Sequence, residues 1–301
     1  FTPPHWILAC ILVLSLAFTF TSCSNGSSSD SDDEKPTYTV TFNPNGGTGT
    51  MNPQIFVYGE PQKLSPNKFT MDGRDFLGWA KTSGGNIAYD DSSEYTIGAA
   101  DVTLYAVWGK LVNADNAATV IAGLEGGTWE NPNVYTIKIT DKTLTAEQLK
   151  EIGTALYTKS RENKWYGFLS LDLSATELTE IPEKAFLQSH LSGLILPDSL
   201  EAIGIGAFKN NDFEEIVIPD NVKTIADGGF WGCSSLTTIT LPASLTSIGA
   251  SAFKICVSLK TVNYKGTKAQ WETLKANIST TGNDELTGAK IICTDGVING
   301  E

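Results

Sequence analysis

The second half of the chain repeats one pattern of apolar and polar positions. Residues 213–235 and 236–258 align over 23 positions without a gap, residues 191–212 form a copy one residue shorter, and looser copies begin at Phe168 and Leu259. A fixed period of this length predicts a solenoid, because each coil can bury its apolar side chains only against neighbouring coils. The recurrent apolar positions of the two best copies are Ile216, Ile218, Val222, Ile225, Phe230 and Cys233, and Ile239, Leu241, Leu245, Ile248, Phe253 and Cys256.

A different pattern precedes the repeats. Four short segments, 38–42, 54–58, 76–80 and 102–108, alternate apolar and polar residues and are separated by loops rich in Gly, Asn, Asp and Ser. Alternation of period two between turn residues predicts β-strands. We therefore expect a small antiparallel domain over residues 37–109.

Helices are expected at both ends of the solenoid. After a predicted strand at residues 134–139, Thr145 and Gln148 form a capping-box pattern ahead of apolar residues at helical spacing. Thr267 and Gln270 repeat the capping pattern after the last coil. The terminal coils of a solenoid have no neighbour, so we expect these helices to cover them.

The start of the chain has the composition of an export signal. Residues 6–20 are apolar or small, a run too short to span a membrane but suited to the centre of a signal peptide. The four residues that end at Cys23 resemble the relaxed lipobox of bacterial lipoproteins, which implies lipidation of Cys23, with Cys10 as the rival site. Residues 24–36 are polar and acidic, which predicts a hydrated tether. An ordinary signal peptide and an uncleaved anchor remain alternatives.

The first folded segment resembles a family of surface modules. Its motifs are Tyr38-x-Val40-x-Phe42 with Asn45-Gly46-Gly47, then Phe76-x-Gly78-Trp79, then Leu104-Tyr105-Ala106-x-Trp108. This ordered set is similar to the Listeria-Bacteroides repeat, the B-repeat of internalin B. The resemblance implies a β-grasp-like fold that serves as a stalk or adhesive module. We interpret Trp79 and Trp108 as core residues, with a ligand-binding aromatic patch as the alternative.

The repeats resemble the treponemal, BspA-like class of leucine-rich repeats, whose pattern ends in Ala-Phe-x-x-Cys. Residues 248–253 match this pattern without a gap, and residues 264–271 resemble the usual ending of such proteins. Cys233 and Cys256 share one column of the repeat. Neighbouring coils lie about 5 Å apart, so the column admits either a disulfide or a ladder of buried thiols.

The outward positions of the repeat strands form the candidate binding site. The residues that flank each buried strand position are expected to point out of the concave face. Polar residues there indicate a solvated sheet, but Ile195 and Val217, beside Glu214 and Glu215, break that rule. We expect them to form the apolar centre of a protein-binding patch with an acidic rim, although isolated exposed apolar residues are common. The candidate site residues are Asp172, Ile195, Glu215, Val217, Thr238, Thr240 and Asn263.

Charge and composition narrow the range of functions. The chain has 34 Asp and Glu against 21 Lys and Arg, a net charge of −13, which argues against nucleic acid as a partner. Of its two histidines only His190 lies outside the expected leader, so neither a Ser-His-Asp triad nor a histidine-rich metal site is expected. We therefore expect no enzyme activity, no cofactor and no metal.

Together these inferences predict an α+β, multidomain protein. The expected segments are a signal peptide (1–22), a lipidated cysteine and tether (23–36), a β-grasp-like B-repeat domain (37–109), an N-terminal cap (110–167), leucine-rich repeats (168–264) and a C-terminal cap (265–301). The resemblances imply an exported, lipid-anchored monomer on the outer membrane or cell surface that binds host matrix proteins or other bacteria. The alternative is a structural or periplasmic envelope lipoprotein that contacts other proteins without adhesion.

Overall fold

The computed structural model describes residues 35–298, except residues 86, 129, 131–132 and 163–166. The expected leader, Cys23 and almost all of the expected tether lie outside the described residues. From Pro36 onward the chain forms one compact unit. Within the described part, none of the helices has the length and apolar character needed to cross a bilayer.

The first domain contains a mixed sheet, not the antiparallel sheet that the alternation suggested. Its strands are β1 (Thr37–Asn43), β2 (Gln54–Val57), β3 (Pro61–Lys63), β4 (Asp75–Ala80), β5 (Glu94–Thr96) and β6 (Val102–Val112). β1 pairs antiparallel with β2 but parallel with β6, and β6 pairs antiparallel with β4. The prediction was wrong at β1 and β6, because the first and last strands of the domain run in the same direction side by side. Alternation alone carries no information on direction.

Aromatic side chains fill the core of this domain. Trp79 is fully buried and packs against Phe42 and Phe76, with ring centroids 4.8 and 4.9 Å away. Trp108 is also buried, and its indole N–H donates to the Pro44 carbonyl at 2.8 Å. The interpretation of both tryptophans as core residues is confirmed.

One sheet continues from the first domain into the repeats. The last residues of β6 pair in parallel with β7 (Val134–Ile139), which pairs in parallel with β8 (Phe168–Asp172). Helices α1 (Ala114–Ala122) and α2 (Ala146–Ser160) lie between these strands in the sequence. α2 begins at the predicted capping box, where Thr145 and Gln148 bond reciprocally. α1 was not predicted, because it is only nine residues long and two of its three buried residues, Ala114 and Ala117, are small.

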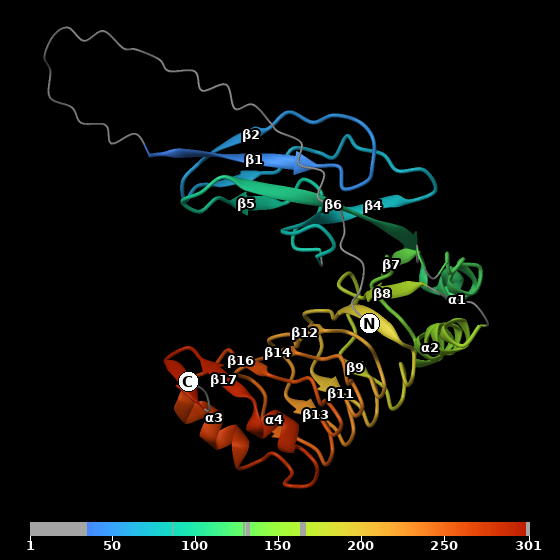
Figure 1. Ribbon diagram of the computed structural model, residues 1–301, viewed down its shortest axis with the longest axis vertical. Coiled ribbons are helices and arrows are strands. Elements are labelled where there is room, and N and C mark those ends of the chain that lie inside the picture. The colour runs from blue at the N-terminus through green and yellow to red at the C-terminus, as the bar shows by residue number, and fades with distance from the viewer. Residues whose placement is uncertain (1–34, 86, 129, 131–132, 163–166, 299–301) are drawn as a thin grey trace, which may run out of the picture. The chain divides into compact units, whose positions relative to one another are not determined.

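The first four coils each contribute one longer and one shorter strand to two lines of parallel strands, and the last coil contributes a longer strand to one line. The longer strands are β8, β10 (Leu191–Ile195), β12 (Glu215–Val217), β14 (Thr238–Leu241) and β16 (Thr261–Tyr264), and the shorter are β9 (Glu180–Ile181), β11 (Ala202–Ile203), β13 (Thr224–Ile225) and β15 (Ser247–Ile248). Figure 1 shows the coils stacked between α1 and α2 at one end and α3 (Lys268–Lys275) and α4 (Asp284–Gly288) at the other.

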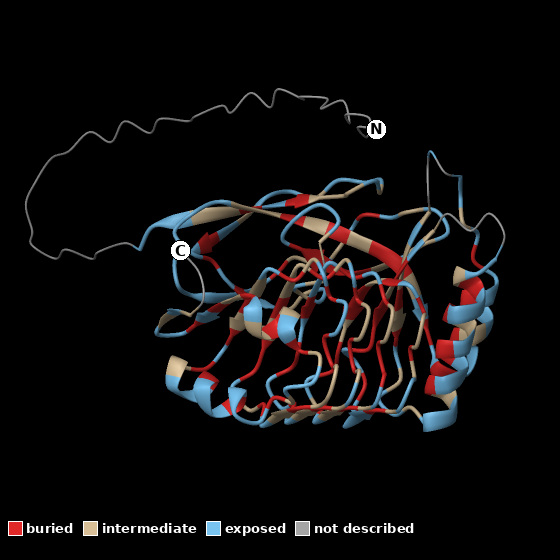
Figure 2. Cartoon of the chain, turned by 60° about the horizontal axis from the view of Figure 1, so that its bottom comes forward, coloured by how far each residue is buried: buried red, intermediate tan, exposed pale blue. Residues whose placement is uncertain are grey.

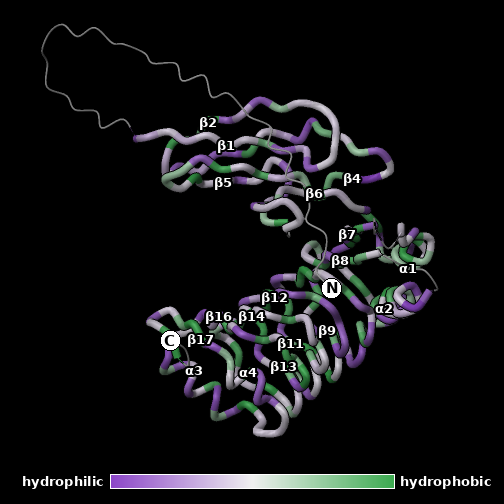
Figure 3. Tube along the Cα trace, viewed as in Figure 1, coloured by the Kyte–Doolittle hydropathy of each residue, from purple (hydrophilic) through white to green (hydrophobic). Residues whose placement is uncertain are grey.

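The repeated apolar positions face the interior of the stack, as predicted. All twelve positions named for the two best copies are buried, and the buried and apolar segments run along the inside of the coils (Figures 2 and 3). Phe186, Phe208, Phe230 and Phe253 form a continuous ladder with centroid separations of 5.7, 5.4 and 5.3 Å. This ladder ties consecutive coils together through aromatic contact as well as strand pairing.

The cysteine column contains thiols. Cys233 and Cys256 are free and fully buried. Each thiol donates to a carbonyl of the preceding coil at 3.2 Å, Cys233 to Phe208 and Cys256 to Phe230. In the coil before, Asn211 occupies the same column and donates to the carbonyls of Phe186 and Phe208. The column therefore satisfies buried carbonyls, and the thiol ladder is the alternative that the structure supports.

The C-terminal end is closed by a helix and a hairpin. α3 begins at the second predicted capping box and buries Trp271 and Leu274. β17 (Lys290–Cys293) adds to β16 in parallel, and β18 (Gly296–Ile298) folds back antiparallel to β17. The sequence did not indicate β18 or α4. These two strands extend the line of longer strands beyond the last coil.

Candidate functional site

The outward side chains of β12, β14, β16, β17 and β18 form a surface that we call the strand face. In-register pairing aligns them in two rows. One row runs across Glu215, Thr238, Thr261 and Lys290, and the other across Val217, Thr240, Asn263, Ile292 and Val297. Five of the seven predicted site residues therefore lie together on one sheet.

The second row carries apolar side chains at both of its ends. Val217 is 56% exposed, and Ile292 and Val297 are 37% and 41% exposed. Thr240 and Asn263, between them, are half-buried. Ile292 and Val297 were not among the predicted site residues. The alternation in Lys290 to Cys293, with Ile291 buried, was the available signal for Ile292.

Asp172 does not have the solvent-exposed position expected of it. Its side chain is fully buried: Ser174 N donates to Oδ1 at 2.8 Å, and Lys138 Nζ lies 3.8 Å from Oδ2. Lys138 also pairs with Asp90 at 2.9 Å. The prediction failed because these covering residues come from outside the repeats, on β7 and in a loop of the first domain.

Ile195 is half-buried and is not a cross-strand partner of Val217. β10 belongs to the sheet that begins in the first domain, whereas β12 begins a separate sheet with β14 and β16. The hydrogen-bonded ladder is thus interrupted between these two coils. The apolar pair expected at Ile195 and Val217 is divided by this break.

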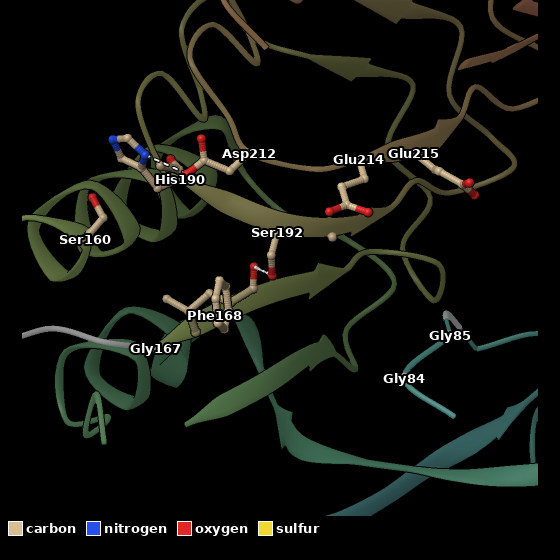
Figure 4. Close-up of a pocket in the computed structure, with 13 residues that line it drawn as sticks. Gly84, Gly85, Ser160, Gly167, Phe168, His190, Ser192, Asp212, Glu214 and Glu215 are labelled. Carbon is tan, nitrogen blue, oxygen red and sulfur yellow. Dashed lines mark hydrogen bonds and ion pairs between the residues drawn. The ribbon is translucent and has the colours of Figure 1, made fainter. Parts of the chain in front are cut away.

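A cavity of about 540 Å³ lies beside the strand face, at the starts of β8, β10 and β12. Asp212, Glu214 and Glu215 line it together with His190 and Ser192 (Figure 4). His190 Nδ1 and Asp212 Oδ2 are 2.8 Å apart, and this hydrogen bond raises the pKa of the imidazole above its usual value. The backbone of His190 is left-handed, with φ of 50°, as expected at a turn between coils.

Among the residues that the structure describes, the Ser-His-Asp arrangement of a hydrolytic triad is not assembled at this cavity. Within the described residues, no serine is hydrogen-bonded to His190, and the Ser192 hydroxyl donates to the Leu169 carbonyl at 3.1 Å. The described part of the chain also holds no cluster of three or more metal-ligating side chains. What the geometry offers is a sheet face with exposed apolar ends and an acidic border.

Comparison with known proteins identifies the two parts of the chain. Residues 38–107 match the Listeria-Bacteroides repeat domain, and residues 158–274 match the BspA type leucine-rich repeat region in six copies. The matched repeat region begins within α2, ahead of the first coil at Phe168. Its six copies exceed the four to five coils expected from the sequence.

One similar solved structure is a leucine-rich repeat protein from Bacteroides ovatus. It is 24% identical to this chain, with a TM-score of 0.35; the match covers 58% of this chain and 39% of that protein. No curated protein matches this chain closely enough to count as a relative. The chain thus carries a Listeria-Bacteroides repeat domain followed by a BspA-type leucine-rich repeat region.

Proposed function

We propose that this chain is an exported bacterial surface protein that binds other proteins through the strand face. The observation that carries the proposal is Val217, which is 56% exposed at the acidic end of an ordered sheet. Exposed apolar side chains inside a polar border are typical of protein-binding surfaces. Repeats of the BspA type are typically binding modules without enzyme activity, and two such surface-type modules occur here in one chain.

We further propose that the partners are host matrix proteins, such as fibronectin or fibrinogen, or the surfaces of other bacteria. The experiment is binding of the purified chain to immobilised matrix proteins and to whole bacterial cells. Saturable binding supports adhesion. Absence of binding to every matrix protein and cell type tested contradicts it.

Display on the cell surface separates adhesion from the alternative, a structural or periplasmic envelope protein. Intact cells that produce the chain are treated with an added protease, and the chain is followed by immunoblot. Loss of the full-length band while a periplasmic control protein survives supports display. Full protection of the chain in intact cells, with digestion after lysis, favours the periplasmic alternative.

We also propose that a lipid on Cys23 holds the protein at the membrane. Two acyl chains would anchor it stably, since each buried methylene contributes about 0.8 kcal/mol. Cells fed a palmitate analogue should label the native chain but not Cys23→Ser. Cys10→Ser serves as the matched control and should keep the label. Label that survives in Cys23→Ser and disappears in Cys10→Ser would move the site to Cys10.

A further inference from the structure

Charges of opposite sign occupy opposite ends of the strand face. In the first row, Glu215 lies on β12 and Lys290 on β17. The residues that immediately precede the strands follow the same order, with Glu214 before β12 and Lys260 before β16. The face therefore has an acidic end at β12 and a basic end at β16 and β17.

These four charged side chains are not neutralised by their surroundings. Within the part of the chain that the structure describes, no ion pair or side-chain hydrogen bond engages any of them. Asp212 borders the same end as Glu214, but its carboxylate is hydrogen-bonded to His190. Each end of the face can accordingly attract a partner charge of opposite sign.

The distance between the two ends limits what can lie across them. Neighbouring strands are about 4.8 Å apart, so the three steps from Glu215 on β12 to Lys290 on β17 span about 14 Å, and the four steps from β12 to β18 span about 19 Å. An extended peptide advances about 3.3 Å per residue, so about six residues cover this width. Along that path the second row offers Val217 at one end, Thr240 and Asn263 in the middle, and Ile292 with Val297 at the other end.

We propose that the strand face binds an extended protein segment of about six residues, which lies across the strands in one fixed direction. A lysine or arginine of the segment contacts Glu214 and Glu215, and a carboxylate contacts Lys260 and Lys290. Apolar side chains of the segment cover Val217 and Ile292, while the hydroxyl and amide groups between them bond to its polar atoms. The inference rests on the proposed protein-binding role of this face and adds the chemistry and direction of the partner.

The test uses a phage library of random linear heptapeptides, selected on the full chain. The proposal predicts enriched sequences with a basic residue near one end, an acidic residue near the other and apolar residues between them. The double substitution Glu214→Lys/Glu215→Lys reverses the charge of the acidic end. It should lower the affinity for a selected peptide about tenfold, since two attractive contacts become repulsive. The matched control, Glu180→Lys/Glu183→Lys, makes the same charge change away from the strand face and should leave binding unchanged.

A charge-swap experiment tests the direction. A chain with Lys260→Glu and Lys290→Glu added to the two glutamate reversals should prefer a peptide whose charged residues are exchanged end for end. Circular dichroism of each variant verifies that the fold is intact. Enrichment of peptides without this charge order, equal binding to the reversed and native chains, or no enrichment at all overturns the proposal.

These outcomes are distinct from those of the adhesion assay. Charge-ordered peptides without matrix binding would retain the inference and refute the proposed class of adhesion partner. Matrix binding without charge-ordered peptides would support the proposed class of adhesion partner and refute the inference.

Discussion

At the scale of single residues, the buried column of Asn211, Cys233 and Cys256 shows how a polar ladder runs through an apolar stack. Each member donates to a carbonyl inside the stack, and the Phe208 carbonyl accepts from both Asn211 and Cys233. An unsatisfied buried carbonyl costs about 1 to 3 kcal/mol, which exceeds the net gain from a typical hydrogen bond. The cysteines at these positions are therefore structural, and no catalytic or cross-linking role is needed to explain them.

We predict that Cys233→Ala lowers the free energy of unfolding by about 1 to 2 kcal/mol, because it opens a small cavity and leaves the Phe208 carbonyl with one donor fewer. Cys233→Ser keeps a donor at this place and should cost less. Chemical denaturation of both variants measures the difference. A larger loss for serine than for alanine would show that the hydrogen bond does not stabilise the fold.

The same burial predicts low thiol reactivity. Desolvation raises the pKa of Cys233 to about 12, so almost no thiolate exists at neutral pH. Iodoacetamide should leave Cys233 unmodified in the folded chain and alkylate it in denaturant, as read by peptide mass spectrometry. Rapid alkylation of this residue under native conditions would contradict the buried assignment.

His190 provides a pH-dependent prediction. The hydrogen bond to Asp212 raises its pKa in the folded state. Its contribution to stability is therefore complete below the pKa of an unfolded histidine and is lost as the pH rises through the folded pKa. The contribution is small, because both side chains are about half exposed. NMR titration of the imidazole should give a lower pKa in Asp212→Asn, and an unchanged pKa would remove Asp212 as the cause.

Asp172 and Val217 show that the exposure of a strand residue could be predicted from the sequence in one case and not in the other. Both occupy outward strand positions, and the repeat pattern predicts the same environment for both. Val217 has that environment, whereas Lys138 and Asp90 cover Asp172. The difference arises from parts of the chain outside the repeats, so no property of the repeat itself could predict it.

At the scale of elements, α2 packs so closely on the coils that one of its glycines has no room for a side chain. A Cβ at Gly153 would lie far inside contact distance of the Ala185 carbonyl oxygen. Glycine inside a helix ordinarily costs about 0.5 to 1 kcal/mol relative to alanine. Here the close approach of the helix reverses that preference.

We therefore predict that Gly153→Ala destabilises the chain by about 1 to 3 kcal/mol, although alanine is the better helix former. Thr154→Ala, on the exposed side of the same helix, is the matched control and should change stability by less than about 0.5 kcal/mol. Thermal unfolding compares them. Stabilisation by Gly153→Ala would mean that α2 does not pack as the structure places it.

Elements with strong local signals were predictable from the sequence and those with weak signals were not. The capping boxes located the starts of α2 and α3, and the repeat period located the coils. α1 is short and buries one bulky side chain, Ile121, and the parallel pairing of β1 with β6 depends on contacts across about 60 residues. Local sequence patterns predict the periodicity of an element and the start of a helix, but they do not predict which strands pair with each other.

At the scale of the whole molecule, acidity is distributed along the chain. Of the net charge of −13, −3 lies in residues 24–36, −3 in residues 37–109 and −7 in residues 110–301. This distribution favours solubility, and it makes nucleic acid an unfavourable partner. The strand face departs from the average, because its two ends carry opposite charges.

The central claim, that this protein binds partners through the strand face, is tested most directly by two matched substitutions. Val217→Asp changes the strand face, and Val257→Asp changes another exposed valine that lies outside it, 72% exposed. The affinity of each variant is measured for a matrix protein or cell surface that the native chain binds. We predict a loss of tenfold or more for Val217→Asp, about 1.4 kcal/mol, and no change for Val257→Asp. Unchanged affinity in Val217→Asp, or an equal loss in both variants, would contradict the claim.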